Sequence, residues 1–201
     1  MEILRYAIMI ALGYLMGSIP VGYLVVKLVK GTDVRQHGSG RSGGTNVWRA
    51  AGPWLAILTT VGDFLKGMCA VLIARAVLGD SIGEVLVGVA AVVGHNWSVF
   101  LGWQGGAGTA TNLGVISALS FPVALALIVI ALLIGFVSRY ASVASLAVAI
   151  LAPTIFLILA LVAQHSLLHA LYGLLAGVIV TLALRRNIVR LLAGTERRQG
   201  Y

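Results

Sequence analysis

The residues best suited to chemistry lie in one short glycine-rich stretch, Gly38-Ser-Gly-Arg-Ser-Gly-Gly-Thr-Asn46, which Arg49 follows. Glycines alternate there with hydroxyl side chains, and basic residues flank the stretch on both sides. Glycine lets successive backbone N–H groups turn towards one point, and clustered N–H groups beside cations bind anions. Because long apolar runs border the stretch, we expect a phosphate site at a membrane surface. The alternative is a glycine-rich connector that only needs to turn.

A second glycine-rich stretch, Gly102–Gly114, opens an apolar helix. Backbone N–H groups at the start of a helix favour anions, so this stretch is a second candidate phosphate loop. The alternative is close helix packing, for which membrane proteins also use glycine. His95 precedes the stretch and could act as a base or as a phosphate ligand. A histidine that is merely hydrogen-bonded at a helix end is an equally good interpretation.

Other polar residues stand in or beside apolar runs. Asp63 and Lys66 are three residues apart, which places them on one helix face where they can pair. They form either a structural ion pair or, if Lys66 points to the membrane surface, part of a phosphate site. Ser142 begins a helix, where capping alone explains a serine. Asn187 lies in a basic tail after the last apolar run, where contact with lipid headgroups is the default explanation.

We expect neither a metal nor a cofactor. His165 and His169 are four residues apart, but two ligands without a third make a poor metal site. No acidic run able to hold magnesium, no Ser-His-Asp order and no Walker-type lysine loop is present in the sequence. Chemistry must therefore rest on positioning and electrostatics.

The composition is that of an integral membrane protein. The chain has 201 residues, is 60% hydrophobic and 10% charged, and has a mean hydropathy of +1.02. Soluble domains are roughly 45–50% apolar and about 25% charged. The net charge of +8 comes from residues that flank apolar runs, so it indicates membrane topology and not nucleic-acid binding. Cys69 is the only cysteine, which excludes an intramolecular disulfide. No soluble domain is left over, so residues 1–201 form one transmembrane domain.

Six apolar runs are near the length of about 20 residues that a spanning helix needs. They cover roughly 3–26, 53–79, 84–101, 111–138, 141–163 and 166–184. The positive-inside rule places the basic loop at 27–52 and the arginine-rich tail in the cytoplasm. With the first loop inside, the N-terminus is outside, so a cytoplasmic C-terminus demands an odd number of spans.

Dividing the run 111–138 into two helices gives the odd number of spans that a cytoplasmic C-terminus requires. Ser120 and Pro122 interrupt it, and a proline after polar residues commonly ends a helix. Division into helices of about 111–120 and 122–138 predicts an all-α bundle of seven helices, some of them short. The rival arrangement has five spans with re-entrant elements. In the seven-helix scheme the loops at 27–52, 102–111 and 138–145 meet the basic tail on the cytoplasmic side.

These residues, in this order, resemble the bacterial membrane family that acylates glycerol 3-phosphate from acyl phosphate. The similarity runs nearly from end to end. The motifs that carry it are Gly17-Ser-Ile-Pro20, Gly38-Ser-Gly with Gly43-x-Thr-Asn46 and Arg49, Asp63-x-x-Lys-Gly67, Gly94-His95, Val99-Phe100, Gly105-Gly-x-Gly108 with Ala110-Thr111, Ser142-x-x-Ser145, and Asn187-Ile-x-Arg-Leu-Leu192 with Gly194 and Glu196.

The resemblance implies a seven-helix bundle in the bacterial inner membrane with its active site on the cytoplasmic face. It implies acyl transfer to the 1-hydroxyl of glycerol 3-phosphate, giving lysophosphatidate and phosphate, the first acylation in phospholipid synthesis. We expect Ser39 and Asn46 to align the acceptor hydroxyl, with His95 as the candidate base. The donor's own phosphate is the alternative proton acceptor. The residues expected to bind substrate phosphates are Thr45, Arg49, Lys66, Gly105, Gly106, Gly108, Ser142 and Asn187.

The chain departs from the family pattern at three positions. Ala107 stands where the second loop usually has lysine, Gln104 stands where a basic residue commonly precedes that loop, and Leu184 replaces a histidine. These losses leave a non-catalytic paralogue as one alternative function, and a small transporter for anions or phosphate esters as another.

Overall fold

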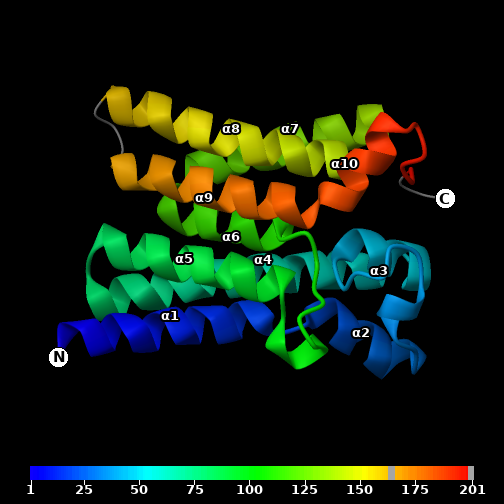
Figure 1. The fold of residues 1–201 in the computed structure, drawn as a ribbon, viewed down its shortest axis with the longest axis horizontal. Helices are drawn as coiled ribbons and strands as arrows, with labels where there is room; N and C mark the ends of the chain where they lie inside the picture. The colour runs from blue at the N-terminus through cyan, green and yellow to red at the C-terminus, as the bar shows by residue number, and fades with distance from the viewer. Residues whose placement is uncertain (163–165, 199–201) are drawn as a thin grey trace.

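Apolar segments fold into long helices in the computed structural model, which describes residues 1–162 and 166–198 (Figure 1). All regular structure in these residues is helical. The α-helices are α1 Glu2–Ser18, α2 Val21–Lys30, α3 Gly44–Ala51, α4 Pro53–Leu78, α5 Ser81–Asn96, α6 Thr109–Leu119, α7 Phe121–Ser138, α8 Ala141–Leu161, α9 Leu167–Ala183 and α10 Arg185–Leu192, with short 3₁₀ turns η1 Val34–Gln36 and η2 Val99–Leu101.

Five helical segments are long and apolar enough to cross a membrane, and a sixth is added if the bent pair α9 and α10 forms one span. This confirms an all-α protein with several membrane-length helices. Helix α6 has 11 residues and falls below that length. The seven-helix count and the orientation of the termini therefore stay predictions, because they require α6 to cross together with its neighbours.

The predicted break in the run 111–138 is confirmed. Helix α6 ends at Leu119, the backbone of Ser120 is extended, and α7 begins at Phe121 with Pro122 in its first turn. Proline lacks the N–H that a helix interior requires but is well accommodated in a first turn, so Pro122 starts α7 and cannot continue α6.

The first apolar run, expected over roughly 3–26, lies within one candidate membrane span, Glu2–Lys30, but it is not one continuous helix. Pro20 divides it into α1 and α2, and the break frees backbone carbonyls from the helical ladder. Distant side chains bind them: the Ser98 hydroxyl donates to Ser18 O at 2.6 Å, and Lys66 Nζ donates to Ile19 O at 2.7 Å. The local signal for this break, Ser18 two residues before Pro20, is the same as at Ser120 and Pro122.

Close helix contacts depend on small residues. A Cβ atom on Gly67 of α4 would lie 2.3 Å from Thr111 O, and one on Gly114 of α6 would lie 1.9 Å from Phe64 O. Both distances are shorter than atoms tolerate, so α4 and α6 can pack this closely only through glycine. Membrane helices commonly associate by such backbone approach, since lipid supplies little hydrophobic drive between them.

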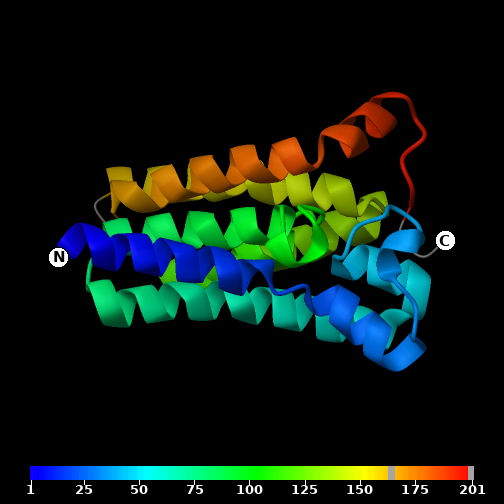
Figure 2. The ribbon, with the colours of Figure 1, turned by 60° about the horizontal axis from the view of Figure 1, so that its bottom comes forward.

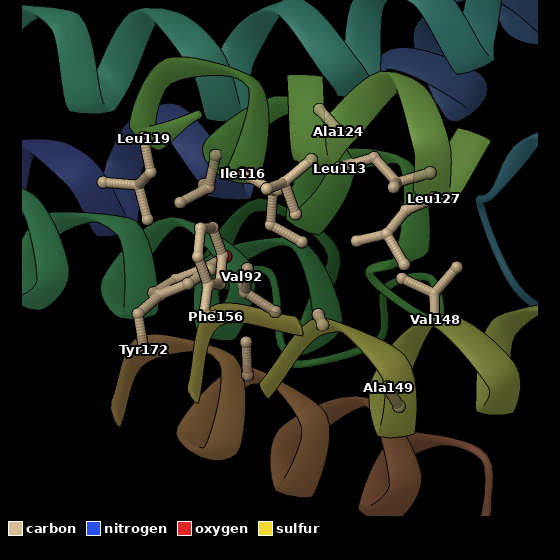
Figure 3. Packing of buried hydrophobic residues seen from close by; sticks show 14 of the residues in the cluster. Val92, Leu113, Ile116, Leu119, Ala124, Leu127, Val148, Ala149, Phe156 and Tyr172 are labelled. Atoms are coloured by element: carbon tan, nitrogen blue, oxygen red, sulfur yellow. The ribbon is translucent and has the colours of Figure 1, made fainter. Parts of the chain in front are cut away.

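The main core lies where α5, α6, α7, α8 and α9 pack together. Phe156 of α8 and Tyr172 of α9 lie at its centre beside Ile116 of α6 (Figure 3), and all three are fully buried. Tyr172 donates its hydroxyl to Asn112 Oδ1 at 2.6 Å, which satisfies both polar groups. This core holds α6 in place, and the second glycine-rich stretch is therefore anchored at its C-terminal side.

The short elements gather at one end of the bundle. Figures 1 and 2 show α2, α3 and α10 at the end opposite the start of α1. The connections between helices that carry the glycine-rich stretches reach the same end, as do the start of α8 and the segment after α10. The convergence predicted from charge is thus confirmed, and it brings together polar residues that are far apart in the sequence.

Candidate functional site

The first glycine-rich stretch, residues 38–46, forms a loop built around a buried amide. Asn46 Oδ1 accepts a hydrogen bond from the Ser39 backbone N–H at 2.8 Å. Its Nδ2 donates to the carbonyls of Val34, His37 and Arg41 at 2.9, 3.1 and 2.8 Å. The side chain is therefore fully engaged with backbone on both sides, and it fixes the course of the loop.

Gly38 shows why this loop needs glycine. Its φ is +54°, and a Cβ atom there would lie 2.3 Å from Asn46 Oδ1. Left-handed backbone and lack of space both exclude a side chain. Helix α3 follows and carries Thr45 in its first turn and Arg49 near its end, so the loop and its expected phosphate-binding residues form one unit.

The second glycine-rich loop, residues 102–108, is seated on the end of α5. Gly106 N donates to His95 O at 3.0 Å, and a Cβ atom on Gly105 would lie 2.0 Å from that same oxygen. Gly108 has a φ of +85°, and its Cβ would lie 2.3 Å from Asn96 Oδ1. The loop therefore follows the backbone of α5 so closely that side chains at these glycines would displace it.

The two loops touch each other. Ser42 N donates to Gly105 O at 3.4 Å, and a Cβ atom on Gly43 would lie 3.9 Å from the Cα of Gly106. The two stretches that the sequence suggested as separate phosphate loops consequently form one continuous surface of backbone groups.

A group of three buried polar side chains supports the second loop. Asp63 Oδ1 lies 2.8 Å from Lys66 Nζ and 3.4 Å from His95 Nδ1, and all three side chains are at most 6% exposed. Lys66 also donates to Ile19 O at the α1–α2 break. The Asp63–Lys66 pair predicted from spacing is confirmed, and its partners are His95 and the broken helix.

A third cluster, centred on Glu196, joins α8, α10 and the tail. Glu196 Oε1 accepts from Asn187 Nδ2 at 2.6 Å and from Ser142 Oγ at 3.1 Å. Glu196 Oε2 accepts from Arg190 Nε at 2.7 Å. Burial disfavours the charged carboxylate, but the hydrogen bonds from Asn187 and Arg190 outweigh it and lower the pKa of Glu196 below its ordinary value.

The tail returns across the first loop. The Arg197 guanidinium donates to Gly38 O, and Arg49 Nη2 donates to the backbone oxygens of Arg197 and Arg198 at 3.4 and 3.3 Å. Arg49 Nε is buried and has no hydrogen-bond partner among the described residues. Burial, and then the positive charge of Arg197, lower the pKa of Arg49. Arg49 therefore retains a buried donor for a further acceptor.

Cations dominate this end of the molecule. The positive charges of several arginines act on Arg41 and Arg49, and the negative charge of Glu196 acts in the opposite direction. Like charges repel each other, and this repulsion is relieved when an anion binds between them. The arginines concerned are Arg185, Arg186, Arg190 and Arg197.

Most residues expected at the site do come together. One group surrounds the first loop, a second belongs to the second loop and its support, and a third surrounds Glu196. The three groups are Ser39, Thr45, Asn46 and Arg49; His95, Gly105, Gly106 and Gly108; and Ser142 with Asn187. Lys66 is connected to the second loop through Asp63 and His95, because its ammonium binds Asp63 and Ile19 O.

Sequence reasoning missed Arg41, whose side chain reaches from the first loop to Ala183 O at the end of α9. A cation inside the glycine-rich stretch was the available signal. Among the residues that the structure describes, no group of histidine, cysteine, aspartate and glutamate could hold a metal. Of the histidine pair, His169 is buried in α9, and His165 lies outside the described residues.

Known proteins resemble this chain along nearly its whole length. A family model described as glycerol-3-phosphate acyltransferase matches residues 7–194. A glycerol-3-phosphate acyltransferase of Desulforudis audaxviator is 45% identical, with 100% of this chain and 99% of the relative covered. One from Rubrobacter xylanophilus is 42% identical, with 96% and 94% covered.

Solved structures show the same fold. The crystal structure of PlsY, an integral membrane glycerol 3-phosphate acyltransferase, in its glycerol 3-phosphate form has a TM-score of 0.86 and 39% identity, and 97% of this chain and 96% of that chain are covered. Its lysophosphatidic acid form has a TM-score of 0.83, 37% identity and coverage of 97% and 95%.

Proposed function

The chain belongs to the glycerol-3-phosphate acyltransferase family, and we propose that it transfers an acyl group from acyl phosphate to the 1-hydroxyl of sn-glycerol 3-phosphate. The hydroxyl oxygen attacks the acyl carbonyl carbon, and the bond between that carbon and the phosphate oxygen breaks. The hydroxyl proton goes to the released phosphate. The products are 1-acylglycerol 3-phosphate, which is lysophosphatidate, and inorganic phosphate.

One observation carries this proposal: two backbone-lined glycine loops are in contact at an end of the bundle where, among the described residues, several arginines act on Arg41 and Arg49 and outnumber the carboxylate of Glu196. Two phosphorylated substrates bring several negative charges together. Fixed N–H groups and guanidinium groups offset their repulsion without any reorganisation during the reaction. The excess of positive charge is therefore what this reaction requires.

Arg49, Thr45 and the N–H groups of Gly105 and Gly108 bind the substrate phosphates, whereas the Gly106 N–H is engaged with His95 O and shapes the loop. Arg49 is suited to this role because its Nε is a buried donor that no described residue uses. Ser142 and Asn187 complete the pocket through the cluster around Glu196.

Two expected roles change with the geometry. Asn46 shapes the first loop through its own four hydrogen bonds, so Ser39, whose backbone Asn46 holds, is left to align the acceptor hydroxyl. Lys66 supports Asp63 and the α1–α2 break, so it acts on the site through His95 and does not contact a phosphate.

His95 positions the second loop, and a phosphate oxygen of the donor accepts the proton. Acyl phosphate has a good leaving group, which makes a dedicated protein base unnecessary. His95 Nδ1 faces Asp63, and its Nε2 lies against Gly106, so the imidazole is held between a carboxylate and the loop backbone. The acyl chain enters from lipid and lies between helices of the bundle.

We infer that the protein lies in the bacterial cell membrane with the site on its cytoplasmic side; the arginines that surround the site support this, because they satisfy the positive-inside rule in that orientation. Acyl phosphate and glycerol 3-phosphate then reach the site from the membrane and the cytoplasm respectively. No nucleic-acid partner is implied.

Purified protein in detergent tests the function. With acyl phosphate and glycerol 3-phosphate we expect lysophosphatidate and an equal amount of released phosphate. Acyl-CoA and acyl carrier protein, offered in parallel, should give no product. Turnover with either of them would assign another donor. Absence of turnover with all three donors would favour a non-catalytic paralogue, and movement of phosphate esters into sealed vesicles without acylation would favour a transporter.

A further inference from the structure

We propose that Arg41 is a phosphate-binding residue, and that it supplies from the first loop the cation that the second loop lacks. The inference rests on the proposed function, because the phosphate concerned belongs to glycerol 3-phosphate or to the acyl phosphate donor. It goes beyond that function by giving a substrate-binding role to a residue inside the glycine-rich stretch.

The backbone of Arg41 is fixed at the junction between the loops. Its carbonyl accepts from the buried Asn46 Nδ2 at 2.8 Å. The next residue, Ser42, donates its N–H to Gly105 O in the second loop at 3.4 Å. The Arg41 side chain therefore starts beside the point where an N–H of the first loop donates to a carbonyl of the second loop.

The guanidinium of Arg41 is held in place but not neutralised. It donates to Ala183 O, the last residue of α9. In the described part of the chain, the ion pairs within 4.0 Å do not include Arg41. A guanidinium has five N–H donors in a planar fork that matches phosphate oxygens, so a single carbonyl leaves most of its binding capacity free.

The surroundings of Arg41 make an anion favourable. Burial lowers its pKa most, and the positive charges of Arg190, Arg186 and Arg185 lower it further, while the carboxylate of Glu196 acts in the opposite direction. Glu196 is already bound by Arg190. A phosphate bound here would remove the repulsion that the free site holds among these guanidinium groups.

The second loop offers no cation of its own. Gln104 and Ala107 are uncharged, and Leu184, next to the carbonyl that Arg41 binds, is a buried apolar residue. The N–H groups of the second loop can orient a phosphate, but they supply little net charge. Arg41 brings a cation to this junction, because its side chain reaches the residue before Leu184 and its neighbour Ser42 contacts the second loop.

A purely structural role is the competing explanation. The last carbonyls of a helix lack partners within it, and an arginine that binds Ala183 O caps the end of α9. The two roles predict different measurements. If Arg41 is only a helix cap, its loss lowers stability and leaves the KM of both substrates unchanged. If Arg41 binds phosphate, its loss raises the KM of the substrate whose phosphate it binds.

The experiment compares Arg41→Ala, Arg41→Lys, Ala107→Lys and the double variant Arg41→Ala/Ala107→Lys with the wild type. Arg41→Ala should raise the KM for one substrate about ten- to a hundredfold, as expected for loss of a charged hydrogen bond. Arg41→Lys should lose less. Ala107→Lys in the Arg41→Ala background should recover most of the KM, since it restores a cation to the same cradle. Lys30→Ala, an exposed cation on α2, is the charge-matched control and should stay within threefold.

The KM values for glycerol 3-phosphate and acyl phosphate, measured separately, show which phosphate Arg41 binds. The proposal is overturned if Arg41→Ala lowers kcat and the unfolding temperature together, leaves both KM values unchanged, and is not rescued by Ala107→Lys. That outcome identifies the helix cap.

A binding measurement separates this inference from the proposed function. Glycerol 3-phosphate and inorganic phosphate should raise the unfolding temperature of the wild type, and Arg41→Ala should abolish this shift. If no donor supports turnover but the shift depends on Arg41, the phosphate site stands and the acyltransferase function fails. An equal shift in wild type and Arg41→Ala would sink the Arg41 assignment even if acyl transfer is observed.

Discussion

The imidazole of His95 lies directly beneath Gly106, so that a Cβ atom on Gly106 would be 2.1 Å from His95 Nε2. The φ of Gly106 is not in the left-handed region, so the requirement for glycine comes from the ring and not from backbone strain. The second loop and the buried Asp63–Lys66 pair therefore meet at one histidine.

Gly106→Ala should lower kcat/KM at least tenfold, because the new methyl group must push His95 away or lift the loop from α5. The acyltransferase assay with both substrates measures it. Gly43→Ala is the matched control, since its Cβ would find ordinary contact at 3.9 Å from Gly106, and it should cost much less. Equal losses in the two variants would show that His95 does not set the position of the loop.

His95→Gln should retain measurable turnover if the donor phosphate accepts the proton. Glutamine keeps a polar side chain but cannot serve as a base, so the KM values should rise more than kcat falls. If His95→Ala and His95→Gln both abolish turnover without raising either KM, His95 is the base and the phosphate-assisted mechanism is wrong.

Arg49→Ala should lower kcat/KM about 10- to 100-fold, or roughly 1.4–2.7 kcal/mol of transition-state binding. Because Arg49 also holds the tail through Arg197 and Arg198, a chain that ends at Glu196 is the control. If Arg49 acts on phosphate, truncation should cost much less than Arg49→Ala. Equal losses, or a loss below threefold for Arg49→Ala at unchanged protein level, would make Arg49 only an anchor.

Asp63→Asn should destabilise the protein by about 3–5 kcal/mol, because Lys66 would keep a charge with no counter-ion in a buried position. Lys66→Met should be similarly harmful. The double variant should cost less than the sum of the single variants, since neither charge is then left alone. Thermal unfolding in one detergent measures all three proteins, and strict additivity would contradict a coupled buried pair.

Because the pKa of Glu196 is lowered in the folded protein, we expect the protein to lose stability in acid. Its folded pKa lies below the ordinary value of 4.5, so its contribution is complete above that pH and disappears as the pH falls through the folded pKa. At pH 7, Glu196→Gln should cost about 1.5–3 kcal/mol of unfolding free energy. Below pH 4.5 the difference between wild type and variant should shrink. Glu2→Gln, at an exposed position on α1, is the control, and a difference independent of pH would contradict this role.

How much of this protein follows from its sequence is clearest at two prolines. Pro122 follows polar Ser120, and this local signal was enough to predict that α6 ends and α7 begins there. Pro20 has the same local signal, because Ser18 precedes it by two residues, but only the structure shows that Ser98 and Lys66, from distant parts of the chain, bind the freed carbonyls. Composition and charge determined the membrane class and the gathering of basic loops at one end, because these depend on residue type alone.

The partners of individual side chains were decided by the tertiary structure. Spacing placed Asp63 and Lys66 on one helix face, but it could not show that His95 completes the group, because α5 meets α4 only after packing. Likewise, Arg41 is an ordinary cation in a glycine-rich stretch until the bundle brings Ala183 and the second loop beside it. Local sequence fixes which groups are available and which backbone they can adopt, whereas the contacts that give each group its role form between segments far apart in the chain.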